Sequence, residues 1–130
     1  MIEKIRILIV DDSAFMRKYI SDMLNNESDV EVIDTAGDGD TAIEKIKSLK
    51  PDVVTLDVEM PGKNGLEALK EIKKISSAEV IMLSGFTTEG SATTVEALSI
   101  GAFDFVEKPS GASLHQMYKI KNDLLNKIRH

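Results

Sequence analysis

The sequence contains no cysteine and no tryptophan, and it has only two histidines and three prolines among its 130 residues. Without cysteine there is no disulfide framework and no thiolate nucleophile, which excludes redox catalysis through sulfur. The absence of cysteine also fits a reducing compartment. Zinc is disfavoured as a cofactor, because its usual protein ligands are histidine and cysteine side chains.

Long hydrophobic runs are missing as well. None approaches the roughly 20 apolar residues that a helix needs to span a bilayer. The apolar stretch near the N-terminus ends at Val10 and is followed at once by Asp11 and Asp12. It is too short for the core of a signal peptide and has no small-residue cleavage site. We therefore expect a cytoplasmic protein that does not associate with the membrane.

The sequence also lacks an excess of basic residues. Its 16 lysines and arginines stand against 22 aspartates and glutamates, which gives a net charge of −6. Nucleic-acid binding calls for lysine and arginine clustered on one face. The lysine-rich stretches at 45–50, 70–74 and 119–127 instead alternate with apolar residues, as on solvated helix faces. We do not expect this domain to bind nucleic acid.

What the sequence does contain is a regular alternation of strand-length apolar runs and helical patterns. The length and the 42% hydrophobic content suit one domain over residues 1–130. Strands are predicted at 5–10, 30–35, 53–56, 80–84 and 103–106. A helix is predicted after each strand. The first is capped by Ser13, the second follows a turn at 37–40 and ends before Pro51, and the fourth ends at Gly101.

The two middle strands are nearly all apolar, so helices must cover both faces of the sheet. Successive strand–helix units of this kind predict an α/β fold. We expect a doubly wound five-stranded parallel sheet of order 2-1-3-4-5, with five helices distributed over its two faces. Sheets of this type place their chemistry beyond the carboxyl ends of the strands.

Polar side chains stand where the predicted strands end. Asp11 and Asp12 follow the first strand, and Asp57 ends the third. Ser84 ends the fourth strand, and Lys108 follows the fifth. Because the carboxyl ends of parallel strands meet at one edge, these groups should converge. Clustered carboxylates repel one another, and with only oxygen ligands at hand a hard divalent ion such as Mg²⁺ is the simplest partner.

One of these carboxylates could attack a phosphoryl donor and form an aspartyl-phosphate. Mg²⁺, Lys108, and Ser84 or a backbone N–H would each meet one phosphoryl oxygen. Every residue also has an ordinary interpretation. Asp57 could be a turn residue, Asp11 and Asp12 could favour a helix N-terminus, Ser84 could be a cap and Lys108 a loop residue. Their joint placement at successive strand ends favours the phosphoryl-transfer interpretation.

The candidate residues lie in four segments: VDDS at 10–13, LDVEMPG with NGL at 56–66, MLSG at 82–85, and GAFDF leading to KP at 101–109. Over residues 4–128 the chain resembles the receiver domain of two-component response regulators, which has a flavodoxin-like fold. The resemblance implies phosphorylation at Asp57 by a phosphohistidine on a sensor histidine kinase. It also implies that Asp12, Asp57 and the backbone carbonyl of Glu59 bind Mg²⁺, while Asp11 acts through water.

The same resemblance implies that Ser84 and Lys108 contact the phosphoryl group. Ser84 and Phe105 would form the switch pair, in which the aromatic ring turns inward as the hydroxyl moves toward the phosphoryl group. The surface that changes would comprise the fourth helix, the fifth strand and the fifth helix. Phe105 could equally be an ordinary core residue. The Lys108–Pro109 peptide bond is expected to be cis, as in the family.

Within the family, segments 55–61 and 105–111 look most like the receiver of the chemotaxis protein-glutamate methylesterase. The Asn64-Gly65 pair departs from that pattern, since Asp-Gly is commoner there. This implies a chemotaxis kinase as donor and an output domain outside these residues. No Gly-x-Ser-x-Gly elbow is present, so we expect no enzyme activity beyond self-phosphorylation and autodephosphorylation. A stand-alone chemotaxis receiver that signals by protein binding is the alternative. The face of the last helix could also pair with a second copy to form a homodimer.

Two other classes share parts of this pattern. A haloacid-dehalogenase-like phosphatase also uses an aspartate nucleophile with Mg²⁺, but it carries an Asp-x-Asp pair on its first strand, where this chain has Asp11-Asp12. A flavodoxin-like cofactor binder should have a phosphate loop rich in Ser, Thr and Gly after the first strand. Asp11 and Asp12 at that place would repel the phosphate of FMN. Both alternatives are less favoured than the receiver.

Overall fold

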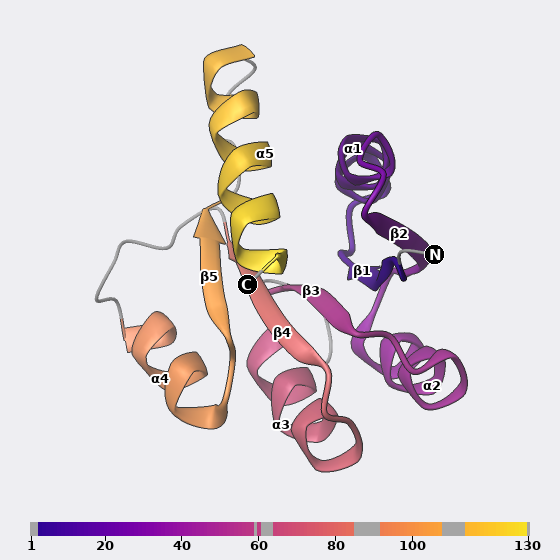
Figure 1. The fold of residues 1–130 in the computed structure, drawn as a ribbon. Helices are drawn as coiled ribbons and strands as arrows, with labels where there is room; N and C mark the ends of the chain where they lie inside the picture. The colour runs from indigo at the N-terminus through magenta and orange to yellow at the C-terminus, as the bar shows by residue number, and fades with distance from the viewer. Residues whose placement is uncertain (1–2, 59, 61–63, 85–91, 108–113, 130) are drawn as a thin grey trace.

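The computed structural model describes residues 3–58, 60, 64–84, 92–107 and 114–129 (Figure 1). Strands and helices alternate along the whole chain. The elements, in chain order, are β1 (Ile5–Val10), α1 (Ala14–Asn25), β2 (Val30–Ala36), α2 (Gly39–Leu49), β3 (Val53–Asp57), α3 (Gly65–Ile75), β4 (Glu79–Ser84), α4 (Ala92–Ile100), β5 (Asp104–Glu107) and α5 (Leu114–Ile128). None of the helices within these described ranges has the length and apolar character needed to cross a bilayer.

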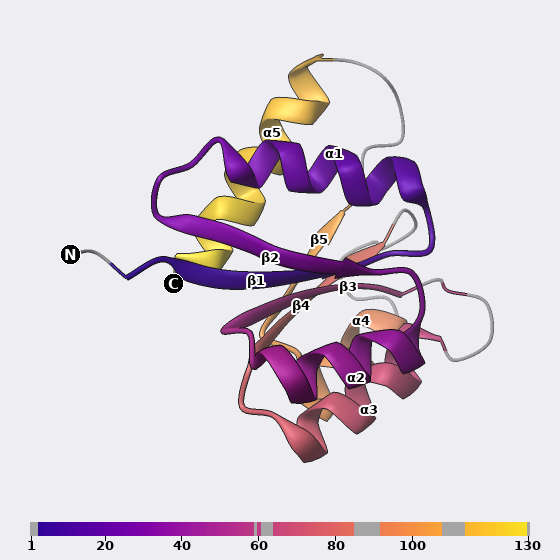
Figure 2. The same cartoon turned by 90° about the vertical axis from the view of Figure 1, so that its right-hand side faces the viewer.

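The strands form one parallel sheet with the order β2-β1-β3-β4-β5. Helices α1 and α5 lie on one face of this sheet, and α2, α3 and α4 lie on the other (Figure 2). The predicted doubly wound α/β fold and its strand order are therefore confirmed. The chain crosses between faces next to β1 and β3, so the carboxyl ends of these two central strands form the topological switch point.

Alternation along the strands supplies two separate cores, because successive side chains point to opposite faces. Ile7 and Ile9 of β1 pack with the buried side chains of α1 and α5, which we call the α1–α5 core. Leu8 and Val10 pack with those of α2, α3 and α4, which we call the α2–α4 core. All four of these β1 side chains are fully buried. Continuous burial explains why the central strands read as uninterrupted apolar runs.

Helices α1, α2 and α3 each begin after a residue whose side chain accepts a hydrogen bond from the first helical turn. The Ser13 hydroxyl accepts from the amide of Met16 at 3.2 Å, which confirms the predicted cap of α1. The Asp38 carboxylate caps α2 through the amide of Thr41 at 2.7 Å, and Asn64 caps α3. Residues 37–40 were predicted as a turn, but α2 begins at Gly39 because Asp38 already caps the helix there.

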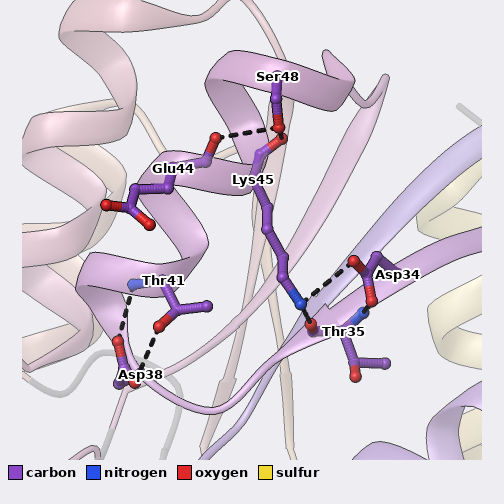
Figure 3. A network of polar contacts seen from close by, with 7 residues as sticks. All are labelled: Asp34, Thr35, Asp38, Thr41, Glu44, Lys45 and Ser48. Carbon is purple, nitrogen blue, oxygen red and sulfur yellow. Dashed lines mark hydrogen bonds and ion pairs between the residues drawn. The ribbon is translucent and has the colours of Figure 1, made fainter.

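The corner between β2 and α2 is fixed by a polar network that extends beyond the cap (Figure 3). Lys45 of α2 reaches back to β2, where its ammonium group donates to the carbonyl of Thr35 at 2.5 Å and lies 3.1 Å from the Asp34 carboxylate. Asp38 also accepts from the hydroxyl of Thr41 at 3.1 Å. The turn at Ala36 and Gly37 is therefore anchored on both sides. This corner adjoins the end of β1.

Candidate functional site

Three carboxylates meet at the carboxyl edge of the sheet. Asp11 and Asp12 directly follow β1, and Asp57 is the last residue of β3. Val10 lies opposite Leu56 in the register between these strands, which brings the next residues of both strands together. One carboxylate oxygen from each of the three aspartates lies within 4.8 Å of the others. The structure thus brings together the three acidic residues that the sequence singled out.

Burial makes this cluster a candidate metal site. Asp11 is fully buried and Asp57 is only 1% exposed, whereas Asp12 is exposed. Withdrawing two carboxylates from water so close to a third is costly unless positive charge offsets their repulsion. A hard divalent cation with oxygen ligands fits this donor set, and Mg²⁺ binds in proteins through a small number of carboxylates plus water and phosphate. The residues present therefore fit a magnesium site.

The end of β1 is held by several hydrogen bonds to Asp11. Its amide donates to the carbonyl of Ala36 at 3.0 Å, and its carboxylate accepts from the amide of Ser13 at 2.9 Å. Its backbone carbonyl accepts from the guanidinium of Arg17 at 2.7 Å. Sequence reasoning missed Arg17. The available signal was its place one helical turn after the Ser13 cap, which directs a long cationic side chain back toward the strand end.

The end of β3 is held by its neighbours β4 and α3. The amide of Val58 donates to the carbonyl of Leu83 at 2.9 Å, and the carbonyl of Val58 accepts from the amide of Gly65 at 3.0 Å. A Cβ on Gly65 would lie 2.4 Å from the carbonyl oxygen of Asp57 and 2.6 Å from the Cα of Val58. Residue 65 must therefore be glycine for α3 to approach this strand so closely. The sequence analysis singled out the Asn64-Gly65 pair as part of a motif but missed this contact.

Of the remaining predicted site residues, the structure describes only some. Ser84 is the last residue of β4 and follows Leu83, which lies opposite Asp57, so its backbone stands at the same edge. Glu59, Lys108 and Pro109 lie outside the described residues. The carbonyl ligand, the phosphoryl contact of the lysine and the cis peptide bond therefore stay predictions.

Phe105 lies on β5, opposite Met82, and is partly buried against the α2–α4 core. Its backbone carbonyl accepts from the ammonium group of Lys127 at 2.5 Å, and its amide donates to the Asp104 carboxylate at 2.8 Å. Lys127 also lies 3.7 Å from Asp104 and 3.4 Å from Asp123. Sequence reasoning did not single out Lys127. It ties the strand that carries the predicted switch residue to the last turns of α5.

Comparison with known proteins gives consistent results. The family model described as the response regulator receiver domain matches residues 7–119. The protein-glutamate methylesterase/protein-glutamine glutaminase of Geobacillus kaustophilus is 52% identical over 126 residues, which are 97% of this chain and 36% of that protein. The chain thus spans about a third of the length of the curated methylesterases that it matches.

Solved structures agree with the sequence comparison. The response regulator domain of Thermotoga maritima CheB has a TM-score of 0.91 and 50% identity, and the match covers 98% of this chain and 95% of that one. The CheX–CheY–BeF₃–Mg²⁺ complex from Borrelia burgdorferi gives a TM-score of 0.80 and 31% identity over 97% of this chain and 87% of the other. With the sheet order and the acidic cluster already in place, these matches show that the chain belongs to the response regulator receiver domain family, and that it resembles the receiver domain of chemotaxis methylesterases.

Proposed function

We propose that Asp57 accepts a phosphoryl group in a Mg²⁺-dependent reaction whose donor is a phosphohistidine of a sensor histidine kinase. The observation that carries this proposal is the close approach of the Asp11, Asp12 and Asp57 carboxylates at the switch point of the sheet. Membership of the receiver family supports the same assignment. The BeF₃ and Mg²⁺ named with the Borrelia complex belong to that protein, and they support a magnesium site here by similarity.

The chemistry at Asp57 is a substitution at phosphorus. A carboxylate oxygen of Asp57 would form the new P–O bond while the bond from phosphorus to the donor nitrogen breaks, and the imidazole leaves with its electron pair. Mg²⁺, when bound, offsets negative charge on the phosphoryl oxygens. Asp12, Asp57 and the carbonyl of Glu59 would hold the ion, and Asp11 would act through water. Asp11 and Asp57 are the two buried residues of the cluster, whereas Asp12 is exposed.

The phosphoryl oxygens need further partners, and the sequence offers Ser84 and Lys108. The backbone of Ser84 stands at the correct edge, one residue beyond the partner of Asp57 in the β3–β4 register. A hydroxyl and an ammonium group would each meet one phosphoryl oxygen and stabilise the charge that spreads over them. In this proposal Ser84 would also move toward the phosphoryl group, and Phe105 would turn inward beside it.

The surface formed by α4, β5 and α5 would report the change to an output. Phe105 is half-buried against the α2–α4 core. The output we propose is a chemotaxis methylesterase domain, because relatives of that name match nearly all of this chain over about a third of their own length. A cytoplasmic receiver domain over residues 1–130, phosphorylated by a chemotaxis kinase, is part of this proposal. Sequence following residue 130 in the source gene would test the methylesterase assignment.

Labelling with a small phosphoryl donor tests the central proposal. Acetyl phosphate with Mg²⁺ should label the chain stoichiometrically, and Asp57→Ala should abolish the label. Asp22→Ala is a matched control, since Asp22 is an exposed carboxylate on α1 that pairs only with Lys18 in the described structure. Label that persists in Asp57→Ala would contradict the assignment. Multiple turnover on small phosphomonoesters would instead favour a phosphatase.

A further inference from the structure

Arg17 connects α1 to the strand that precedes it. Its guanidinium Nη1 donates to the backbone carbonyl of Asp11 at 2.7 Å, in a partly buried contact that spans six residues of sequence. The amide of Arg17 donates to the carbonyl of Ser13 at 3.0 Å, so the backbone of Arg17 belongs to the first turn of a capped helix. The side chain therefore reaches from a rigid helix to the end of β1.

The same guanidinium lies against the turn between β2 and α2. A Cβ built on Gly37 would lie 3.1 Å from Nη1 of Arg17 and 3.7 Å from its Cζ. Ala36, next to Gly37, accepts the amide hydrogen of Asp11 through its carbonyl. This turn does not yield easily, because Lys45 and Asp38 anchor its two sides (Figure 3). Arg17 and Asp11 are thus packed against one fixed corner.

The hydrogen bond from Arg17 fixes the orientation of a peptide group and does not neutralise a carboxylate. The carbonyl of Asp11 belongs to the peptide group that joins Asp11 to Asp12, so its orientation sets the direction in which both carboxylates leave the backbone. The carboxylates of this segment repel each other and Asp57, which favours any movement that separates them. A donor on the carbonyl opposes that movement, and the contact does not use the carboxylate oxygens.

We propose that Arg17 is a positioning residue for the metal site: it holds the end of β1 against the β2–α2 turn so that Asp11 and Asp12 stand opposite Asp57 before a cation binds. The inference rests on the proposed function, since it concerns the same magnesium site. If Arg17 acted only through its charge, its removal would change the Mg²⁺ affinity in the opposite direction. A nearby positive charge competes with Mg²⁺, so removing it would tighten binding, whereas removing a positioning contact weakens binding.

The experiment compares Arg17→Met with Lys18→Met in the full 130-residue chain. Both variants lose one positive charge from neighbouring positions of α1, but the Lys18 side chain is 80% exposed and pairs only with Asp22 in the described structure. Isothermal titration with MgCl₂ should give a Kd about tenfold higher for Arg17→Met, in the range typical of lost contacts that orient metal ligands. The Kd of Lys18→Met should match the wild type.

A second measurement needs no metal. Amide hydrogen exchange in EDTA should be faster in Arg17→Met at Asp11 and Ser13, whose amides bond to Ala36 and to the Asp11 carboxylate. Exchange at Leu56, on the neighbouring strand β3, should stay unchanged. Hydrogen exchange tests the positioning role of Arg17 separately from the proposed function. If the wild type binds no Mg²⁺, the proposed function fails, but the exchange data still decide whether Arg17 holds the end of β1.

Gly37→Ala provides an independent variant that leaves Arg17 in place. The added Cβ would lie 3.1 Å from Nη1, so the guanidinium must shift by a few tenths of an ångström, and such a shift disturbs its 2.7 Å bond to the carbonyl of Asp11. We expect a several-fold rise in the Kd for MgCl₂, and no further rise when Gly37→Ala is added to Arg17→Met. Additive effects in this cycle, unchanged or tighter Mg²⁺ binding in Arg17→Met, or unchanged exchange at Asp11 and Ser13 would each overturn the inference.

Discussion

Gly65 and Asp57 are in backbone contact: a Cβ at residue 65 would lie 2.4 Å from the carbonyl oxygen of Asp57. This approach is closer than any side chain tolerates, and the atoms in the way belong to the backbone of β3 rather than to a flexible side chain. The N-terminus of α3 is held there by the bond from the Gly65 amide to Val58 and by the Asn64 cap. The position of the proposed phosphoacceptor therefore depends on the absence of a side chain at residue 65.

Gly65→Ala should both destabilise the fold and slow labelling of Asp57. Forcing a methyl group into this contact moves α3 away from β3 or shifts Asp57, and overpacking of this kind costs about 1–3 kcal/mol. Urea unfolding and the rate of labelling by acetyl phosphate measure the two effects. Gly101→Ala is the control. It strains a backbone with φ of 126° at the end of α4 and should lower stability without changing the labelling rate. A Gly65→Ala protein with wild-type labelling would contradict this account.

Thr55→Val should leave stability unchanged or raise it by about 1 kcal/mol. Thr55 is fully buried in β3 between Ile9 and Ile81, and within the described part of the chain its hydroxyl has no hydrogen-bond partner. A buried hydroxyl without a partner costs about 1–3 kcal/mol, while valine keeps the shape. The free energy of unfolding in urea measures the effect. Thr55→Ala loses the same hydroxyl but leaves a cavity, and it should be less stable than Thr55→Val. A clear loss of stability in Thr55→Val would mean that the hydroxyl has a partner.

Mg²⁺ should stabilise the folded chain, and chelation should reverse the effect. The three-carboxylate site exists only in the fold, so binding adds RT ln(1 + [Mg²⁺]/Kd) to the free energy of unfolding, about 2.7 kcal/mol at a hundred times the Kd. Thermal unfolding with MgCl₂ and then with EDTA measures the shift. Asp57→Asn should lose most of it, whereas Asp22→Ala should keep it. Equal stabilisation of wild type and Asp57→Asn would place the metal elsewhere.

Arg129→Met should lower the Tm at neutral pH by an amount that shrinks in acid. Arg129 donates to Asp29 at 2.7 and 2.8 Å and to Glu27 at 2.9 Å, and these hydrogen bonds hold the pKa of both carboxyl groups below their usual range. Carboxylates with depressed pKa values stabilise the fold above their unfolded pKa, near 4, and lose this contribution as the pH falls through their folded values.

The Tm values of the wild type and Arg129→Met should therefore converge as the pH falls below about 4. Lys18→Met provides the control, because the Lys18–Asp22 pair is largely exposed and should contribute little at any pH. A Tm difference for Arg129→Met that stays constant from neutral to strongly acidic pH would show that the guanidinium acts through packing alone.

Most of the fold could be predicted from the sequence because its signals are local. Strand-length apolar runs, which alternate with helical patterns along the sequence, located all the strands, and β1 matched its predicted bounds. The Ser13 cap of α1, the stop of α2 before Pro51 and the closure of α4 at Gly101 were confirmed, since caps and breakers act within a turn of the helix. The predicted start of α2 was wrong because Gly39 was assigned to a turn, although the preceding Asp38 caps the helix.

Some contacts that support the fold were not predictable in this way, because they join residues distant in sequence. The Arg129–Asp29 pair spans 100 residues, and Lys127 reaches Phe105 across 22. Strand order alone was enough to bring Asp11, Asp12 and Asp57 together, since parallel strands end at one edge. The supporting contacts of Arg17 and Gly65 depend on how closely helices approach the sheet, and no periodic pattern records that distance.

Phosphorylation of Asp57 can be tested by locating the phosphoryl group chemically. After reaction with acetyl phosphate and Mg²⁺, borohydride reduces an aspartyl-phosphate to homoserine, and tandem mass spectrometry of the digested chain then reads the altered residue. We expect homoserine at position 57 alone, formed only when Mg²⁺ is present and not in Asp57→Ala. Homoserine at position 11 or 12, or an unmodified residue 57 in a labelled chain, would contradict it.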